Sequence, residues 1–370
     1  MKRTRTAMTV LIAIGFLALL SAPVWAQTHG GTGVLKIKPG ARATSMGQAG
    51  VALNQRAHAI WWNPALLTQA YGREISSTVV KLVPDLADDV YYLNLAYTQH
   101  LEGWGGFGVN VMYLSYGKTE AVDFEGRSYG FFSSYEFVPS IGFGTRLIGD
   151  DATPEGGSGM LSALDVGISL KYVWVDLAPE WAMRVVDIHK DGRADAFAVD
   201  LGGLIQGGLP IPTLSGGSMP YSIGVNIQNL GSKLVYIEAD QGDPLPRNLK
   251  AGLGLRLYDS ESFRVTGAID FNKALITYSS DPMEETDGIG WGDAKELWNM
   301  GLEASLVKKL NFRLGYVNDP EGEIEAMTFG AGLDVSFGSG SKVIRFDYSS
   351  VPQALDLDRV SYLTVGVLFL

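Results

Sequence analysis

The residue types that most often carry chemistry are few in this sequence and stand far apart. The four histidines are His29, His58, His100 and His189, and none of them has the His-Glu-x-x-His spacing or another metal-binding spacing. The chain has no cysteine, which excludes disulfides, thiolate metal ligands and cysteine nucleophiles together. The sequence therefore predicts no catalytic residue, no metal site, no cofactor and no enzyme, and a structural, hydrogen-bonded role is expected for His58.

Two acidic segments have the composition of cation sites. Residues 187–195 begin like a calcium-binding loop, but Ala198 occupies the twelfth position, where such loops carry a bidentate glutamate. We expect a plain loop there. The second segment could hold divalent cations that bridge to lipopolysaccharide, although a solvated loop is the simpler interpretation. Its acidic residues are Asp281, Glu284, Glu285, Asp287 and Asp293.

The N-terminus has the pattern of a secretory signal peptide. Lys2, Arg3 and Arg5 precede an apolar stretch, and Val24-Trp25-Ala26 fits a small-x-small cleavage site. Removal of residues 1–26 would leave 26 Lys and Arg against 40 Asp and Glu, a formal net charge of about −14. Because this acidic chain also lacks a basic stripe, we do not expect it to bind nucleic acid.

The strongest pattern in the mature sequence is the alternation of apolar side chains with small or polar ones. In the stretch 249–257 the odd positions are aliphatic, whereas the even positions are Lys250, Gly252, Gly254 and Arg256. This alternation is typical of strands with one face on lipid and the other on the lumen of an outer-membrane barrel. Past the signal peptide no apolar run is long enough for a membrane helix, so strands would have to make the crossing.

Runs of this kind predict an all-β fold, a transmembrane antiparallel β-barrel of about fourteen strands. The strands are expected near residues 74–82, 90–99, 104–116, 135–147, 163–175, 194–207, 220–229, 248–258, 262–272, 297–307, 310–317, 325–337, 341–349 and 360–370. Polar stretches at 119–134, 176–193, 241–247 and 278–296 would be the long loops on one side of the membrane.

The predicted inner faces carry many charges. A soluble β-sandwich would alternate as well, but its core would exclude charge, so this feature favours a wet lumen. The residues expected to face the lumen are Lys171, Asp200, Lys250, Arg256, Arg264, Asp270, Glu303, Arg313, Asp334, Arg345 and Asp347. In a wide lumen arginine would be tolerated at Gly252, whereas arginine at Leu253 on the lipid face would cost about 2–4 kcal/mol.

Residues 40–69 do not alternate. They are rich in alanine and glycine and contain a Trp-Trp-Asn-Pro run, in which Asn-Pro is expected to break a helix. We expect this segment to form a plug of short helices inside the barrel. Its characteristic residues are Arg42, Met46, Gly47, Gly50, Trp61, Trp62, Asn63 and Pro64.

This N-terminal segment also resembles a known family. The runs 40–43 (Gly-Ala-Arg-Ala), 46–52 (Met-Gly-Gln-Ala-Gly-Val-Ala) and 62–65 (Trp-Asn-Pro-Ala) look like the N-terminal signature of the PorV/PorQ proteins, which belong to the FadL-like outer-membrane barrels. Further matches lie at 200–202, 228–231, 245–252 and 311–316. The resemblance implies a fourteen-stranded barrel with an internal plug. We therefore expect a signal peptide at 1–26, a plug at 27–73 and a barrel at 74–370.

The resemblance implies two functions and leaves them open. One is passage of a hydrophobic small molecule, and the other is a role in type IX protein secretion with secretion components as partners. A structural barrel that anchors a surface complex without transport is a third alternative. In each case we expect a location in the cell outer membrane and contacts with its lipid and lipopolysaccharide. The terminal strand 362–370 ends Val-Leu-Phe-Leu, which suits recognition by the outer-membrane barrel assembly machinery.

Overall fold

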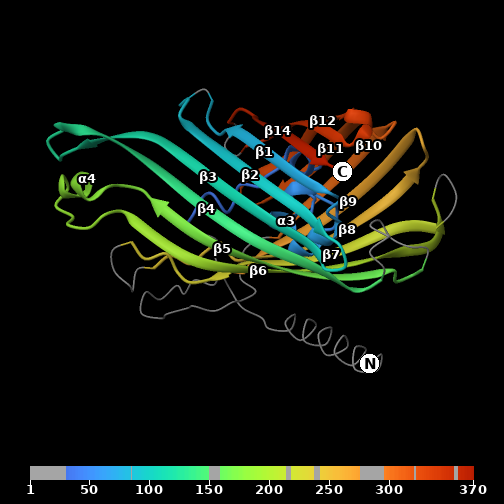
Figure 1. The fold of residues 1–370 in the computed structure, drawn as a ribbon. Coiled ribbons are helices and arrows are strands. Elements are labelled where there is room, and N and C mark those ends of the chain that lie inside the picture. The colour runs from blue at the N-terminus through green and yellow to red at the C-terminus, as the bar shows by residue number, and fades with distance from the viewer. Residues whose placement is uncertain are drawn as a thin grey trace, which may run out of the picture.

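The computed structural model describes residues 31–84, 86–149, 159–213, 218–236, 242–275, 296–320, 322–353 and 357–370. Within these ranges fourteen antiparallel strands close into one barrel, in which each strand pairs with its neighbours in sequence and β1 pairs with β14 (Figure 1). The strands are β1 (Arg73–Lys81), β2 (Val90–Leu101), β3 (Gly105–Val122), β4 (Ser128–Ile148), β5 (Ala163–Asp176), β6 (Arg193–Pro212), β7 (Ser218–Gly231), β8 (Asn248–Asp259), β9 (Phe263–Ala274), β10 (Leu297–Leu306), β11 (Leu310–Asp319), β12 (Ile324–Phe337), β13 (Lys342–Val351) and β14 (Val360–Phe369). The predicted fold class is confirmed.

Some predicted segments lie outside the described residues. They are the signal peptide at 1–26 and the acidic residues Asp281, Glu284, Glu285, Asp287 and Asp293. In the part of the chain that is described, no helix is long and apolar enough to cross a membrane.

The outward face of the barrel is apolar. In β12 Met327, Phe329 and Leu333 are exposed, whereas Thr328 between the first two is buried. Exposed aliphatic and aromatic side chains recur on β5, β10, β11, β13 and β14. A continuous apolar surface of this kind is stable against lipid and unstable in water, so the barrel is of the outer-membrane type.

The length of the links gives the barrel its orientation. Three-residue links join β2 to β3, β8 to β9 and β10 to β11, and all lie on the side where β14 ends. Outer-membrane barrels have their short turns in the periplasm. The ends of β8 and β14 at Asp259 and Phe369 are therefore periplasmic, and the opposite rim is extracellular.

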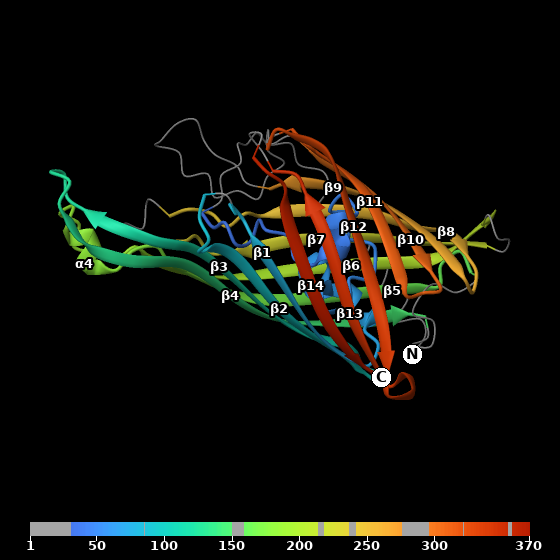
Figure 2. The same ribbon diagram turned by 90° about the horizontal axis from the view of Figure 1, so that it is seen from above.

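Strands β3 and β4 run past the extracellular rim, beside the short helix α4 (Glu180–Arg184) (Figure 2). Pairing of β4 with β5 ends at Tyr135, whereas pairing of β3 with β4 continues from Lys118 to Val122. We call residues 118–133 the hairpin extension. The predicted loop at 119–134 was wrong, because the ladder shifts register between Ser115 and Lys118, where Gly117 has a φ of 79°. That bulge interrupts the alternation from which the strand was predicted.

A plug fills the lumen between Gly31 and Gly72. Its helices are α2 (Ala41–Ser45), η1 (Arg56–His58), α3 (Ala59–Trp62) and η2 (Pro64–Gln69), and they lie inside the barrel wall (Figure 1). The Asn63 side chain accepts a hydrogen bond of 3.0 Å from the Ala65 amide, and Pro64 takes the first position of η2. This is an ordinary helix N-terminus, which explains why α3 ends at Trp62.

Glycines on the inner wall let the plug backbone approach the strands. A Cβ on any of these glycines would collide with plug backbone atoms of Met46, Gly47, Val51, Pro64 or Leu67. The wall glycines are Gly106, Gly144, Gly167, Gly224, Gly301 and Gly315. Gly252 is similarly confined, since its Cβ would meet Asp270 and Val51, so the structure contradicts the expectation of a wide lumen that tolerates arginine there.

Candidate functional site

Eight side chains of alternating charge join the plug to one half of the wall. Arg42 of the plug forms two hydrogen bonds with Glu303 on β10, at 2.7 and 2.9 Å, and Glu303 also accepts a bond of 2.6 Å from Arg313 on β11. Arg313 reaches Asp347 on β13 at 2.6 Å, and Asp347 accepts a bond of 2.9 Å from Arg56 of the plug.

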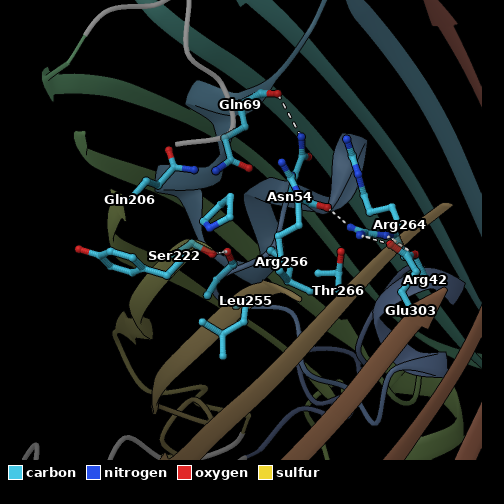
Figure 3. Close-up of a pocket in the computed structure, with 15 residues that line it drawn as sticks. Arg42, Asn54, Gln69, Gln206, Ser222, Leu255, Arg256, Arg264, Thr266 and Glu303 are labelled. Carbon is cyan, nitrogen blue, oxygen red and sulfur yellow. Dashed lines mark hydrogen bonds and ion pairs between the residues drawn. The ribbon is translucent and has the colours of Figure 1, made fainter. Parts of the chain in front are cut away.

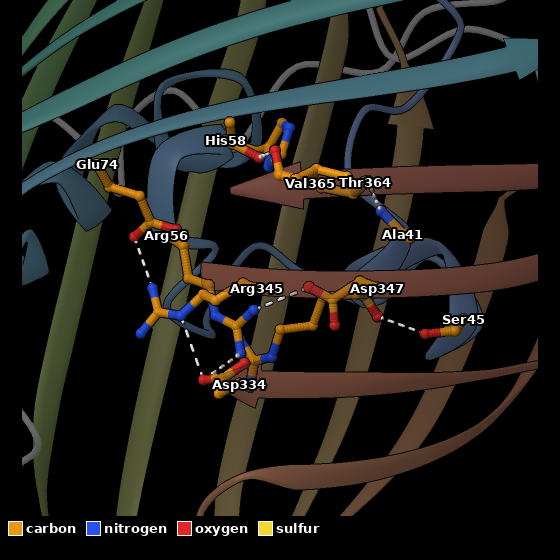
Figure 4. Close-up of polar contacts among 12 residues, drawn as sticks. Ala41, Ser45, Arg56, His58, Glu74, Asp334, Arg345, Asp347, Thr364 and Val365 are labelled. Carbon is orange, nitrogen blue, oxygen red and sulfur yellow. Dashed lines mark hydrogen bonds and ion pairs between the residues drawn. The ribbon is translucent and has the colours of Figure 1, made fainter. Parts of the chain in front are cut away.

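The same series continues to the first strand. Arg56 lies 3.7 Å from Asp334 on β12, and Arg345 on β13 contacts Asp334 at 3.2 Å and Glu74 on β1 at 2.7 Å (Figure 4). We call these residues the ion chain: Glu303, Arg42, Arg313, Asp347, Arg56, Asp334, Arg345 and Glu74.

The ion chain is charge-balanced and largely withdrawn from water. Its side chains are between 0% and 19% exposed, with Arg313 the most buried. A buried ion pair contributes little net stability, but removal of one partner leaves an uncompensated charge and costs about 3–5 kcal/mol. The ion chain therefore holds Arg42 and Arg56, and with them the plug, in one position.

Two titratable plug residues in this region, Arg56 and His58, keep fixed protonation states at neutral pH. Burial acts to lower the pKa of Arg56, but the carboxylates of Asp347 and Asp334 outweigh it and raise that pKa above its ordinary value. Burial lowers the pKa of His58 to about 4 against the attraction of Asp347, so its imidazole is neutral. The His58 Nε2 and the Thr78 hydroxyl on β1 are hydrogen-bonded at 3.1 Å, which is the structural role expected for this histidine.

On the opposite half of the wall, uncharged side chains hold the plug. Asn226 on β7 donates to the Trp62 carbonyl at 2.8 Å, and Gln228 donates to the Trp61 carbonyl at 2.5 Å. The Asn63 amide of the plug donates to the Gly203 carbonyl on β6 at 3.0 Å. Together with the wall glycines, these carboxamides fix the plug by close packing.

Two wall carboxylates receive backbone amides of the plug. Asp270 on β9 accepts bonds of 2.6 and 2.9 Å from the Gly50 and Val51 amides. Glu136 on β4 accepts bonds of 3.0 and 2.8 Å from the Gly33 and Val34 amides, and a further bond from the Thr32 hydroxyl. The sequence prediction included Asp270 and missed Glu136, although Glu136 stands at an inner-face position of the predicted strand 135–147.

Four of the remaining charged residues of the predicted lumen face pair with the wall itself, whereas Lys250 lies over the ring of Trp61 in the plug. Lys171 contacts Asp200 at 2.6 Å on the neighbouring strand, and both side chains are buried. Arg256 and Arg264 lie 3.5 and 3.1 Å from Asp259 at the periplasmic rim. Glu74 also takes part in the ion chain and was missed, because it was placed at the first residue of its strand without a facing assignment.

Small cavities lie on either side of the plug. A periplasmic pocket of about 110 Å³ is lined by Arg42, Asn54, Arg256, Arg264 and Glu303 (Figure 3), and a neighbouring cavity of about 240 Å³ reaches Leu368. A third cavity, of about 210 Å³, lies among the extracellular ends of β7, β8, β9 and β11. Among the described residues, no group of His, Asp and Glu is arranged to hold a metal ion.

The segment that resembled a calcium loop has no such arrangement either. Asp187 is 96% exposed, its φ is 63°, and it follows α4 in a turn. In this part of the structure the chain forms a plain loop.

Comparison with known proteins supports the family resemblance at the N-terminal end of the chain. Residues 26–152 match the family model "Type IX secretion system protein PorV", a stretch that includes the plug and strands β1 to β4. No protein with a curated description matches the sequence. The resemblance inferred from the plug motifs is thereby confirmed, and the protein is an outer-membrane β-barrel.

Several solved structures are similar to this chain at low sequence identity. The toluene transporter TbuX of Ralstonia pickettii is 15% identical, with a TM-score of 0.49 over 89% of this chain and 96% of that chain. The toluene transporter TodX of P. putida is 14% identical, with a TM-score of 0.45 over 89% of this chain and 96% of that chain. A FadL homologue of Pseudomonas aeruginosa is 8% identical, with a TM-score of 0.43 over 91% of this chain and 99% of that chain.

Proposed function

We propose that this protein serves type IX protein secretion as a plugged outer-membrane barrel, binding exported proteins or secretion components at the cell surface and catalysing no reaction. The observation that carries the proposal is the contrast between a lumen filled by the plug and the hairpin extension, which exposes aromatic side chains at the cell surface. The hairpin extension stands outside the membrane, and the matched family residues 26–152 contain both the plug and this extension.

The hairpin extension exposes aromatic side chains that a free surface rarely carries. Phe124 is 86% exposed, Phe131 is 66% exposed and Tyr129 is 55% exposed. Phe132 packs edge-on against Trp181 of α4 at 6.1 Å, which braces the ribbon from one side. Exposed aromatic residues of this kind are the usual anchors of protein interfaces.

The test replaces the two most exposed phenylalanines, Phe124→Ser and Phe131→Ser, in the host cell. We expect the barrel to insert and show heat-modifiable migration, while proteins exported by the type IX route accumulate in the periplasm and secretion components no longer co-purify. Tyr71→Ser, an aromatic residue that is 69% exposed at the periplasmic side, is the matched control. Normal export by the hairpin variant would contradict the proposal.

Passage of a hydrophobic small molecule is the second candidate, and one feature favours it. An apolar groove of about 510 Å³ lies on the wall over β3 to β7, lined by Val109, Pro139, Ile141, Leu170, Phe197 and Leu230. The ladder is irregular there, since Pro139 interrupts β4 and the pairing of β6 with β7 shifts beyond Val199. This candidate expects Ile141→Trp to reduce cellular uptake of a labelled aromatic hydrocarbon, an effect that the secretion role does not produce.

The finer partners follow from the barrel and its place in the membrane. Lipid and lipopolysaccharide would contact the apolar outer band, and the barrel assembly machinery would receive the terminal strand β14. A barrel that only anchors a surface complex remains the third candidate, and it predicts normal export with the hairpin variant but loss of the complex from the cell surface.

A further inference from the structure

The extracellular cavity of the lumen is lined mainly by positive charge, whereas the whole protein is negatively charged. The chain carries a net charge of −11, yet four cationic side chains and one acidic side chain line this cavity. They are Lys36, Lys38, Arg247, Lys250 and Asp319. We call the cavity, of about 210 Å³, the cationic chamber. Local positive charge in an acidic protein concentrates small anions.

Lys250 is the central group of the chamber. Its side chain is 1% exposed, and its Nζ lies 3.8 Å from the ring centre of Trp61 and 5.2 Å from that of Trp62. Within the described residues, no hydrogen-bond acceptor reaches this nitrogen. The ring faces stabilise the ammonium charge less than water does and accept no ordinary hydrogen bond from it. Lys250 therefore lacks a hydrogen-bonded anionic partner.

Two further donors beside Lys250 are in the same condition. The side-chain nitrogens of Asn272 and Trp61 are buried without an acceptor among the described residues, and both residues line the chamber. Asn272 pairs with Lys250 across β8 and β9, which places the two side chains on the same inner face. Buried donors are normally satisfied, and three such donors around one cavity indicate that an acceptor group belongs there.

Neither neighbouring carboxylate forms a hydrogen bond with Lys250. Asp270 uses one oxygen for the Gly50 and Val51 amides, and its other oxygen is buried without a hydrogen-bond donor among the described residues. Among the described residues that line the chamber, Asp319 on β11 is the one carboxylate, against four cationic side chains.

We propose that the cationic chamber is a binding site for a small carboxylate or phosphate anion, which accepts hydrogen bonds from Lys250 and Asn272 beside Trp61. The volume of the chamber suits a compact anion and leaves little room for a long acyl chain. The chamber lies at the extracellular ends of the strands. This proposal is independent of the secretion role, since it concerns the lumen and not the hairpin extension.

The test uses the purified mature protein in a non-ionic detergent, titrated separately with inorganic phosphate and with succinate. Binding is followed by calorimetry and by tryptophan fluorescence, which reports the anion because Lys250 lies over Trp61. We expect saturable binding of at least one of the two anions. Lys250→Met should weaken it about ten- to a hundredfold, as expected for the loss of one charged hydrogen bond.

Three controls keep the result interpretable. Lys250→Arg keeps the charge and should bind more tightly than Lys250→Met, while Lys81→Met, at an exposed lysine outside the chamber, should bind as the unaltered protein does. Trp61→Phe should remove the fluorescence change and keep the calorimetric signal. Heat-modifiable migration shows that each variant is folded. Absence of binding by the unaltered protein, or equal binding by Lys250→Met, would overturn the proposal.

Discussion

The two halves of the barrel wall hold the same plug by different physical means. From β10 round to β1 the ion chain holds the plug and carries two of its four arginines on it, while Gly301 and Gly315 add close backbone contacts. From β3 to β8 the contacts are glycines at backbone distance, carboxamides that donate to plug carbonyls, and the Glu136 carboxylate, which accepts plug amides without a cationic partner on the plug. The ionic half depends on complete charge pairing, whereas the packed half depends on the absence of side-chain volume. The comparison teaches that one segment can be fixed by two mechanisms that respond to different perturbations.

The largest expected effect comes from removing the plug from both halves at once. Deletion of residues 31–69, with the signal peptide kept, should leave an inserted barrel whose ion conductance in planar bilayers rises from near zero to that of an open channel, since a lumen of fourteen strands admits water. Loss of Arg42 and Arg56 leaves four acidic and two basic members of the ion chain, so the open channel should prefer cations. Unchanged conductance in a folded variant would show that the plug does not occlude the lumen.

The ionic half alone is tested by Arg313→Met. Glu303 and Asp347 would each lose a partner at 2.6 Å while staying buried, so the free energy of unfolding should fall by about 3–5 kcal/mol. The measurement is the urea dependence of heat-modifiable migration. Arg127→Met removes an exposed guanidinium paired with Asp123 and should leave the free energy of unfolding nearly unchanged. Equal losses in the two variants would mean that the ion chain carries no special weight.

Acid should loosen the ionic half through His58. The pKa of this residue is about 4 in the folded protein, below the ordinary value of about 6.5, so the unfolded chain binds more protons between these pH values. Its contribution is fully present above about pH 6.5 and is lost as pH falls toward 4, by up to about 3 kcal/mol. The test compares unfolding between pH 7 and pH 4 for the protein and for His58→Gln. A steeper pH dependence in the variant would reverse the sign assigned here.

The packed half is tested by Gly167→Val, where a Cβ would collide with the Pro64 backbone. We expect a loss of about 1–3 kcal/mol, as for other overpacked sites. Gly203→Val is the matched control, because nothing lies within 4 Å of a Cβ at that glycine. Gly167→Val should also leave unchanged the part of the pH dependence of stability that comes from His58. A shift in that dependence would show that the two halves are coupled.

The strands of both halves could be predicted from the sequence, but the contacts that hold the plug could not. Alternation along 249–257 and 327–337 predicted strands and their facing, because the period of two is a property of each strand alone. The pairing of Arg42 with Glu303 was not predictable, since it joins residues 261 positions apart and depends on how the plug sits in the closed barrel. The same holds for Gly252, whose neighbours come from the plug and from β9.

Two misses had a visible signal. Glu136 stood on the inner face of a predicted strand, where a buried carboxylate needs hydrogen-bond donors. Gly117 interrupted the alternation, and an isolated glycine within a strand pattern is a common sign of a bulge that the strand survives. The hairpin extension was lost from the prediction because the break was read as the end of the strand.

The path of the plug through the lumen sets the order in which this protein can be built. Thr32 to Val34 are bound to Glu136 near the extracellular ends of the strands, whereas β1 begins at Arg73 on the periplasmic side, so the segment threads the whole lumen. The first and last strands meet at a seam where Thr364 on β14 accepts a bond of 3.0 Å from the Ala41 amide and lies 2.8 Å from the Thr78 hydroxyl on β1. A finished barrel would have to admit a folded segment end-on past Glu303 and Asp347. Closure of the barrel around a plug that is already in place avoids that passage. The plug would then fold first, and β1 and β14 would pair around it.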